Sequence, residues 1–121
     1  MTVEPIAHAF SVCKTRTLPQ LDPDIPFCFT AKTDGECSLV CPTPYVPAGV
    51  LAREDGWRAF RIRGPLDFSL VGVLADIAGL LAEHRISVFA VSTYDTDYIL
   101  TKEAHFDRAL ALLAQAGWTV A

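Results

Sequence analysis

The sequence predicts an α+β fold, and three observations lead to that prediction. In the second half of the chain, strand-like segments at 57–64 and 86–92 enclose an apolar pattern with the period of a helix. A second helical pattern follows another strand-like segment near the end of the chain. The first half contains strand-like segments but breaks its longest connection with prolines, which exclude a helix there.

The bulk composition is that of a globular protein. The chain has 121 residues, of which 51% are hydrophobic and 20% charged, enough for one ordinary domain or two very small ones that share a core. A net charge of −4 with scattered basic residues argues against a nucleic-acid partner. The apolar stretch 70–82 is shorter than the roughly 20 residues of a membrane span, and no signal-peptide pattern begins the chain. We expect a cytoplasmic protein without a membrane partner.

The second half predicts its elements in order. Residues 57–64 alternate as a strand and stop at Gly64 and Pro65. A helix of about four turns is expected over 67–84, because apolar residues recur along one face there. The segments 86–92 and 98–102 are rich in β-branched and aromatic residues and predict a hairpin.

The end of the chain completes a recognisable order. Apolar residues at Phe106, Leu110 and Leu113 predict a helix that ends at Gly117, and a short strand follows at 118–120. The order β-α-β-β-α-β is the split pattern of a ferredoxin-like sheet with both helices on one face. The segment 86–92 is apolar on both faces, so something must cover its second face or edge, and we expect a homodimer.

The first half reads as a shortened copy of the same unit. Strands are expected at 9–15, 27–32 and 36–41, the last two joined by the Asp34-Gly35 turn signal. Prolines replace the first helix, and one or two helical turns fit within 46–56. We therefore predict a degenerate N-terminal unit at 1–55 and a complete unit at 56–121, packed together as one body.

The four cysteines all lie in the first third of the chain. Cys37 and Cys41 share one face of a predicted strand about 13 Å apart, which is too far for one tetrahedral metal ion. Their expected role is that of small hydrophobic side chains in the core, with metal binding and redox chemistry as the less favoured alternatives.

The stretch RGPLDFSLVG is one candidate binding segment. Gly64 permits unusual backbone angles, and Asp67 or Ser69 lies where the following helix needs a cap. The backbone N–H groups of about residues 68–71 then lack helical partners and can hold a carboxylate, while Asp67 can accept from an ammonium group. The alternative is an ordinary capped helix.

The polar run STYDTD, residues 92–97, is the second candidate. Another strand separates the end of the strand 86–92 from the start of the helix by about 10 Å, so a second copy packed alongside would complete a site. The alternative is a solvated hairpin turn. Asp95 and Asp97 lack further oxygen ligands for a metal ion, and no catalytic motif or clustered histidine occurs, so we expect no catalytic residue, no metal and no cofactor.

The segment GPLDFSLVGVLADIAGLLAEHRISVFAVSTYDTDYIL resembles an ACT domain of the subgroup related to the CASTOR arginine sensors, and the resemblance covers most of 57–120. The first half is similar to the degenerate N-terminal ACT-like unit of small bacterial members. The resemblance implies a non-catalytic regulatory protein that binds a small ligand, usually an amino acid, at an interface between two ACT units.

The resemblance also implies the residues of a ligand site. They belong to the loop after the first strand of the second half and to the polar run of the hairpin, and they are Gly64, Leu66, Asp67, Phe68, Ser69, Ser92, Thr93, Tyr94, Asp95, Thr96 and Asp97. The ligand and the effector that reads its binding stay open. The alternative function is a protein-interaction module that only assembles and binds no ligand.

Overall fold

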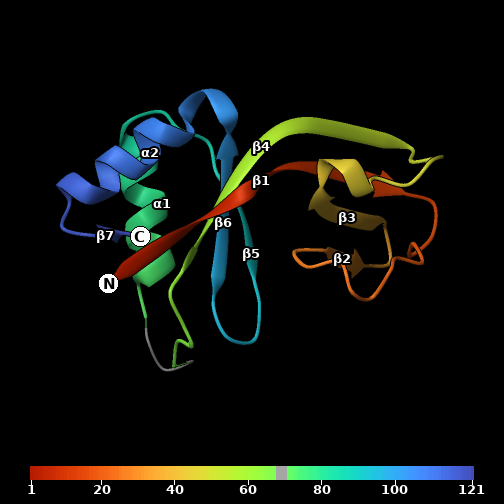
Figure 1. Cartoon of the computed structure of the whole chain (residues 1–121), viewed down its shortest axis with the longest axis horizontal. Helices are drawn as coiled ribbons and strands as arrows, with labels where there is room; N and C mark the ends of the chain where they lie inside the picture. The colour runs from red at the N-terminus through yellow and green to blue at the C-terminus, as the bar shows by residue number, and fades with distance from the viewer. Residues whose placement is uncertain (68–70) are drawn as a thin grey trace. The chain divides into compact units, whose positions relative to one another are not determined.

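A computed structural model of the chain describes residues 1–67 and 71–121. Its strands and helices follow the order β1 (Thr2–Thr15), β2 (Phe29–Lys32), β3 (Cys37–Pro42), the 3-10 helix η1 (Thr43–Tyr45), β4 (Ala52–Ile62), α1 (Val73–Glu83), β5 (Phe89–Ser92), β6 (Asp97–Lys102), α2 (Glu103–Gln115) and β7 (Thr119–Val120). The predicted α+β class is therefore confirmed (Figure 1).

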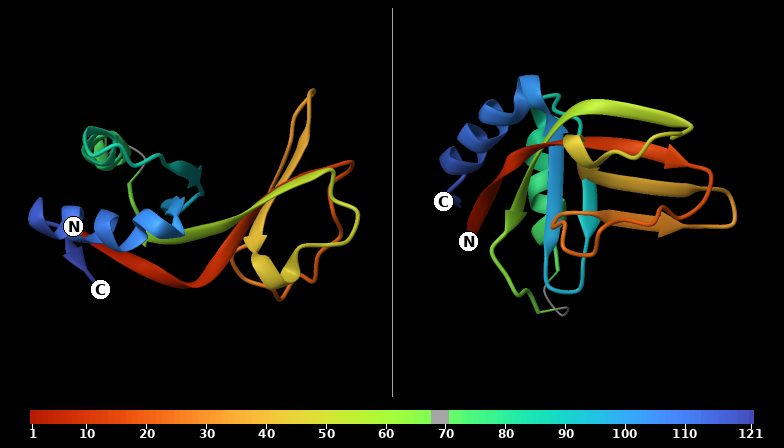
Figure 2. Two further views of the ribbon diagram at one scale, coloured as in Figure 1. Left: turned by 90° about the horizontal axis from the view of Figure 1, so that it is seen from above. Right: turned by 45° about the vertical axis from the view of Figure 1, so that its right-hand side comes forward.

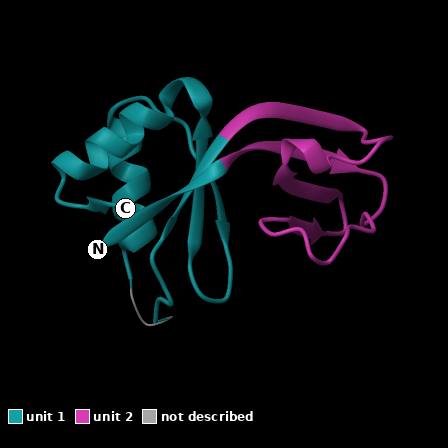
Figure 3. Cartoon of the chain, in the orientation of Figure 1, with its two compact units in different colours: residues 1–7, 58–121 teal, residues 8–57 magenta. Residues whose placement is uncertain are grey.

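The chain forms two compact units (Figure 3). Unit 1 comprises residues 1–7 and 58–121, and unit 2 comprises residues 8–57. Strands β1 and β4 contribute residues to both units, because each unit boundary falls inside one of them. The first seven residues thus belong to the same unit as the second half of the chain.

Unit 1 is a sheet with two helices. Its strands follow the order β1, β4, β6, β5, and β7 pairs with the other edge of β1 through Thr2↔Thr119 and Val3↔Val120. The predicted hairpin is present as β5 and β6, which pair antiparallel from Phe89↔Leu100 to Ser92↔Asp97. Helices α1 and α2 pack together on one side of these strands (Figures 1 and 2).

The core of unit 1 fills the space between the sheet and the helices. Ile77 and Leu81 of α1 lie four residues apart, so both point to the sheet. Phe106 and Leu113 supply the same face of α2, and the ring of Phe106 lies 6.3 Å from that of Phe60. The remaining buried members are Val3, Ile62, Ile86, Ile99 and Ala109. This packing holds the end of β4 and the start of α1 in fixed positions.

Helix α1 begins later than the sequence predicts. It starts at Val73 rather than near Asp67, its N-cap is Gly72 in the left-handed region at φ 84°, and no side chain caps it. The expected cap at Asp67 is therefore wrong, because that residue stays in the loop after β4. The other proposed cap, Ser69, lies outside the described residues.

Three further expectations about elements are wrong. Strand β1 begins at Thr2 rather than at residue 9, although Pro5 lies within it. Residues 52–55 belong to β4, where a helical turn was expected; they are exposed and largely charged, so they show no apolar alternation. The helical turn instead occupies η1, and β5 begins only at Phe89.

Unit 2 consists of paired strands around a small core. Strand β3 pairs antiparallel with β1 on one side and with β2 on the other. The Asp34-Gly35 turn is confirmed, because Thr33 N–H donates to Glu36 O at 2.9 Å. Cys13, Leu39 and Cys41 form the core of unit 2. All four cysteines are free, and the expected packing role is confirmed for Cys13 and Cys41.

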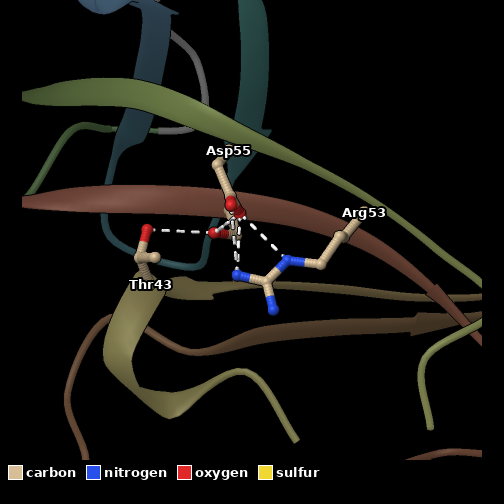
Figure 4. A network of polar contacts seen from close by, with 4 residues as sticks. Thr43, Arg53 and Asp55 are labelled. Carbon is tan, nitrogen blue, oxygen red and sulfur yellow. Dashed lines mark hydrogen bonds and ion pairs between the residues drawn. The ribbon is translucent and has the colours of Figure 1, made fainter. Parts of the chain in front are cut away.

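A polar network ties the strands of unit 2 to η1 (Figure 4). The buried Ser11 hydroxyl donates to Asp55 Oδ1 at 2.5 Å and lies 2.9 Å from the Thr43 hydroxyl. Arg53 Nη2 contacts the same carboxylate at 2.9 Å. The hydrogen bond from Ser11, and secondarily those from Arg53, lower the pKa of Asp55. The network therefore favours the ionised carboxylate.

Asp55→Asn is expected to make the stability of the fold less dependent on pH in the acid range. Because the pKa of Asp55 in the folded protein lies below its ordinary value, the ionised carboxylate stabilises the fold above that ordinary pKa, and the contribution is lost as the pH falls through the folded pKa. Thermal melts recorded from neutral pH down to about pH 2 measure the slope. Asp107→Asn, at an exposed position of α2, is the control; equal slopes in both variants would contradict the assignment.

Candidate functional site

A cavity of about 250 Å³ lies in unit 1 where the loop after β4, the start of α1 and the β5–β6 turn meet. We call it the hairpin cavity. It is lined by Leu66, Asp67, Gly72, Val73, Leu74, Ala75, Ser92, Thr93, Tyr94, Asp95, Thr96 and Asp97. The volume is just below the roughly 300–1,000 Å³ of sites for drug-sized ligands, which suits a molecule the size of an amino acid.

Backbone contacts bring the two predicted segments together within one chain. Leu66 N–H donates to Asp95 O at 2.7 Å. A Cβ on Gly64 would lie only 3.0 Å from Asp95 O and 3.2 Å from Thr96 Cβ, so glycine is needed for this approach. The gap that seemed to require a second copy is therefore closed by the loop reaching the turn, an arrangement that ideal strand spacing does not predict.

The two threonines of the polar run hold the turn in shape. Thr93 N–H and its hydroxyl both donate to Thr96 O, at 2.8 and 2.9 Å. The buried Thr96 hydroxyl donates to Ile62 O at 2.6 Å and so ties the turn to the end of β4. Because both hydroxyl protons are used, these side chains can offer a ligand only lone pairs.

Thr96→Val is expected to lower the free energy of unfolding by about 1–2 kcal/mol. Valine has nearly the same shape, but it leaves Ile62 O without this buried donor. Urea denaturation of the variant measures the loss. Thr93→Val removes a more exposed hydroxyl and is the matched comparison; a larger loss in that variant would contradict the role given to Thr96.

The charge around the hairpin cavity is one-sided. Among the described residues that line it, the charged ones are Asp67, Asp95 and Asp97. The start of α1 adds the N–H groups of its first turn, which have no partner four residues earlier inside the helix. The cavity thus presents acceptors for a cationic group beside donors for a carboxylate, and the two kinds are needed together by a zwitterion.

The predicted site residues divide into three sets. Eight of them line the hairpin cavity: Leu66, Asp67 and all six residues of the polar run. Gly64 lies behind the turn, where it lines a neighbouring cavity of about 230 Å³ together with Glu4, Arg61, Pro65, Asp95, Thr96 and Tyr98. Phe68 and Ser69 lie outside the described residues.

Sequence reasoning missed four residues that line the hairpin cavity, namely Gly72 and the three residues that follow it. Val73, Leu74 and Ala75 belong to the first turn of α1, and the helix was expected to start earlier. Gly72 was the available signal, since a glycine just before an apolar helical pattern can adopt the left-handed angles seen here.

The neighbouring cavity has a different character. Arg61 lies between Glu4, whose Oε1 is 3.5 Å from Arg61 Nε, and Tyr98, whose hydroxyl accepts from Arg61 Nη1 at 3.3 Å. Arg63 also reaches Glu4, at 3.5 Å. These contacts link β1, β4 and β6.

The described residues form neither a cluster of metal-binding side chains nor a membrane-spanning helix. Across residues 1–67 and 71–121, no group of three or more His, Cys, Asp or Glu residues is arranged to hold a metal ion. Neither described helix is long and apolar enough to cross a membrane.

Comparison with known proteins gives a family and several relatives. A family model described as an ACT domain matches residues 52–115. The mouse protein named cytosolic arginine sensor for mTORC1 subunit 1 is 35% identical over 86 residues, which cover 65% of this chain and 26% of the sensor. The rat protein of the same name is 31% identical over 96 residues, covering 74% and 29%. The chain thus spans under a third of these relatives.

Solved structures share the fold. Protein Atu0741 from Agrobacterium tumefaciens has a TM-score of 0.87 and 25% identity, covering 99% of this chain and 91% of that one. Protein VC0802 from Vibrio cholerae, described as of unknown function and a possible transport protein, gives 0.73 and 22%, covering 93% and 86%. Aspartate kinase from Synechocystis gives 0.71 and 18%, covering 99% of this chain and 27% of the enzyme.

Proposed function

Because this chain belongs to the ACT domain family, we propose that it is a non-catalytic regulatory protein that binds a small amino acid in the hairpin cavity. The observation that carries the proposal is the convergence of the loop after β4 and the polar run on one cavity within a single chain. A solvated turn would not require three carboxylates, those of Asp67, Asp95 and Asp97, to line the same cavity as the start of α1.

The lining supports a ligand with a cationic group. Asp67, Asp95 and Asp97 offer three carboxylates, against the single helix start that can receive a carboxylate. An amino acid with a basic side chain would use both kinds of group and meet more acceptors than a neutral one. The relatives named as arginine sensors make arginine the first candidate to test.

The proposal extends to the fold of unit 2, which we interpret as a degenerate copy of a ferredoxin-like ACT unit. Strands β2 and β3 begin at Phe29 and Cys37, and β5 and β6 begin 60 residues later at Phe89 and Asp97 (89 − 29 = 97 − 37 = 60). Their registers match under the same offset, from Phe29↔Val40 to Phe89↔Leu100. The short η1 then stands where α2 begins.

The two hairpin turns support the same repeat. In each, the threonine before the turn donates its N–H to the carbonyl oxygen three residues on, from Thr33 to Glu36 and from Thr93 to Thr96. The threonine hydroxyl also accepts from the N–H of that third residue in both turns. A tandem of ACT-like units, with domains divided near residues 55 and 56, accounts for these matches.

The expected partner is a second copy of this chain. A homodimer would cover β5, the edge strand of unit 1, whose Phe89 and Val91 are only half-buried. The proposed location is the cytoplasm, which the name of the relatives supports.

A second candidate function is assembly without a ligand. The same half-buried Phe89 and Val91 on an edge strand favour it, since a partner strand could pair there. In that case no metabolite would change the mass or the stability of the protein, and light scattering with and without amino acids separates the two functions.

The test is a thermal-shift panel of the standard amino acids at millimolar concentration. We expect saturable stabilisation by one or a few chemically related amino acids, with those carrying a basic side chain foremost, because ligand binding to the native state raises stability as RT ln(1 + [L]/Kd). No shift with any member of the panel would contradict amino-acid binding and favour the assembly function.

A further inference from the structure

The register of the β2–β3 hairpin places two thiols opposite each other in unit 2. Phe29 pairs with Val40 at the end of the β2–β3 ladder, and extending that register by one residue beyond β2 brings Cys28 opposite Cys41. The N–H of Thr33 donates to Glu36 O, and hydrogen-bonded pairs alternate with non-hydrogen-bonded ones from there. Counting back from the turn puts Phe29 and Val40 at a hydrogen-bonded position, so the extended register puts Cys28 and Cys41 at a non-hydrogen-bonded position.

That position suits a disulfide. Opposed residues of a non-hydrogen-bonded antiparallel pair have Cα atoms about 4.5 Å apart, and disulfides form at Cα separations of about 4.4–6.8 Å. Cys28 packs against the core cluster that contains Cys41, which agrees with this counting. The two thiols can therefore be joined with little movement of either strand.

The other two cysteines are less well placed. Cys13 lies opposite Leu39 in the β1–β3 pair, so Cys41 is its diagonal neighbour. Diagonal neighbours on adjacent strands lie about 7–8 Å apart, farther than directly opposed residues. Cys37 lies opposite Lys32 at the turn end of the hairpin, about 13 Å along β3 from Cys41. The geometry selects one pair among the four thiols.

Access differs between the two partners. Cys41 is fully buried, whereas Cys28, just before β2, is partly exposed. An oxidant reaches Cys28 first, and Cys41 is then the neighbouring thiol that resolves the oxidised sulfur. An accessible thiol next to a second thiol that can resolve the oxidised sulfur is a common arrangement of redox-sensitive cysteines.

We propose that Cys28 and Cys41 form a dithiol site that hydrogen peroxide converts to a disulfide, reversibly joining the start of β2 to β3. The Cys28 sulfur attacks the peroxide, breaks its O–O bond and becomes a sulfenic acid as one water leaves. The Cys41 sulfur then attacks that sulfur and displaces the hydroxyl as a second water. In total, two thiols and one hydrogen peroxide give one disulfide and two waters, and an external thiol reverses the change.

The reaction is slow at neutral pH. Burial raises the pKa of both thiols, and the pKa of Cys41 reaches about 12 because the nearby Cys28 and Cys13 add to the effect of burial. The thiolate is the reactive form, so the rate of disulfide formation rises with pH across the alkaline range. This inference concerns unit 2 and goes beyond the proposed binding of an amino acid in unit 1.

The test uses the purified full chain treated with hydrogen peroxide. We expect the intact mass to fall by two hydrogens without dimer formation, two of the four thiols to become unreactive to an alkylating reagent, and a Cys28–Cys41 peptide to appear in the unreduced digest. Dithiothreitol should restore the starting mass.

Two variants decide between this pair and the alternatives. Cys28→Ser is expected to abolish the internal link, whereas Cys37→Ser should leave its rate within about two-fold of the parent. A link between Cys13 and Cys41, a disulfide between two chains, or further oxidation of Cys28 to the sulfinic acid in the parent protein would each overturn the proposal.

Discussion

Asp95→Asn is expected to remove most of the thermal stabilisation that the bound amino acid gives the native protein. Asparagine keeps the backbone oxygen that accepts from Leu66 N–H, so the turn keeps its shape while the cavity loses a carboxylate. A ligand present at 100 times its Kd raises the free energy of unfolding by about 2.7 kcal/mol, and the variant is expected to lose most of this increase. Thermal shift and calorimetry with the strongest ligand of the panel measure it.

Matched variants show whether the loss belongs to the cavity. Asp67→Asn and Asp97→Asn should weaken the response as well, because both residues line the hairpin cavity. Asp107→Asn changes the net charge equally but lies on an exposed face of α2, and its response should equal that of the parent. If all these variants respond alike, the ligand binds elsewhere.

Gly64→Val is expected to lower the free energy of unfolding by about 3 kcal/mol, at the upper end for overpacking, and to weaken ligand binding. Any Cβ at this position meets Asp95 O at 3.0 Å, so the loop and the turn must move apart. The hydrogen bond from Leu66 N–H to Asp95 O, which holds the loop against the turn, would then break. Denaturant titration and ligand-induced shifts report the two effects.

Gly79→Ala is the matched control for this substitution. Gly79 lies within α1, and a Cβ there would meet nothing within 4 Å. Alanine in a helix interior is expected to stabilise by about 0.5–1 kcal/mol, and ligand binding should not change. Equal destabilisation by the two variants would contradict the close contact ascribed to Gly64.

Local patterns predicted the hairpins and the second helix well. Both hairpins combine β-branched or aromatic strands with a turn that begins at a threonine, and such signals act within a few residues. Helix α2 shows a clear apolar face and ends before Gly117, whose φ of 100° suits a residue beyond a helix end.

Contacts between residues far apart in the chain could not be predicted from local sequence patterns. The start of β1 joins the second half through Val3↔Val120, and nothing local in a segment containing Pro5 indicates that pairing. The exposed first residues of β4 form a strand because they pair with a neighbour, not because they alternate. For the same reason the single-chain cavity was missed: it depends on the bond between Leu66 and Asp95.

The most direct test of amino-acid binding in the hairpin cavity is an NMR titration of the isotope-labelled chain with arginine. We predict that the amide signals of residues 66–67, 73–75 and 92–97 shift in proportion to one another and saturate together. Signals of unit 2 should stay in place. Saturable shifts that map to other residues, or no shifts at all at millimolar arginine, would contradict the proposed site for this ligand.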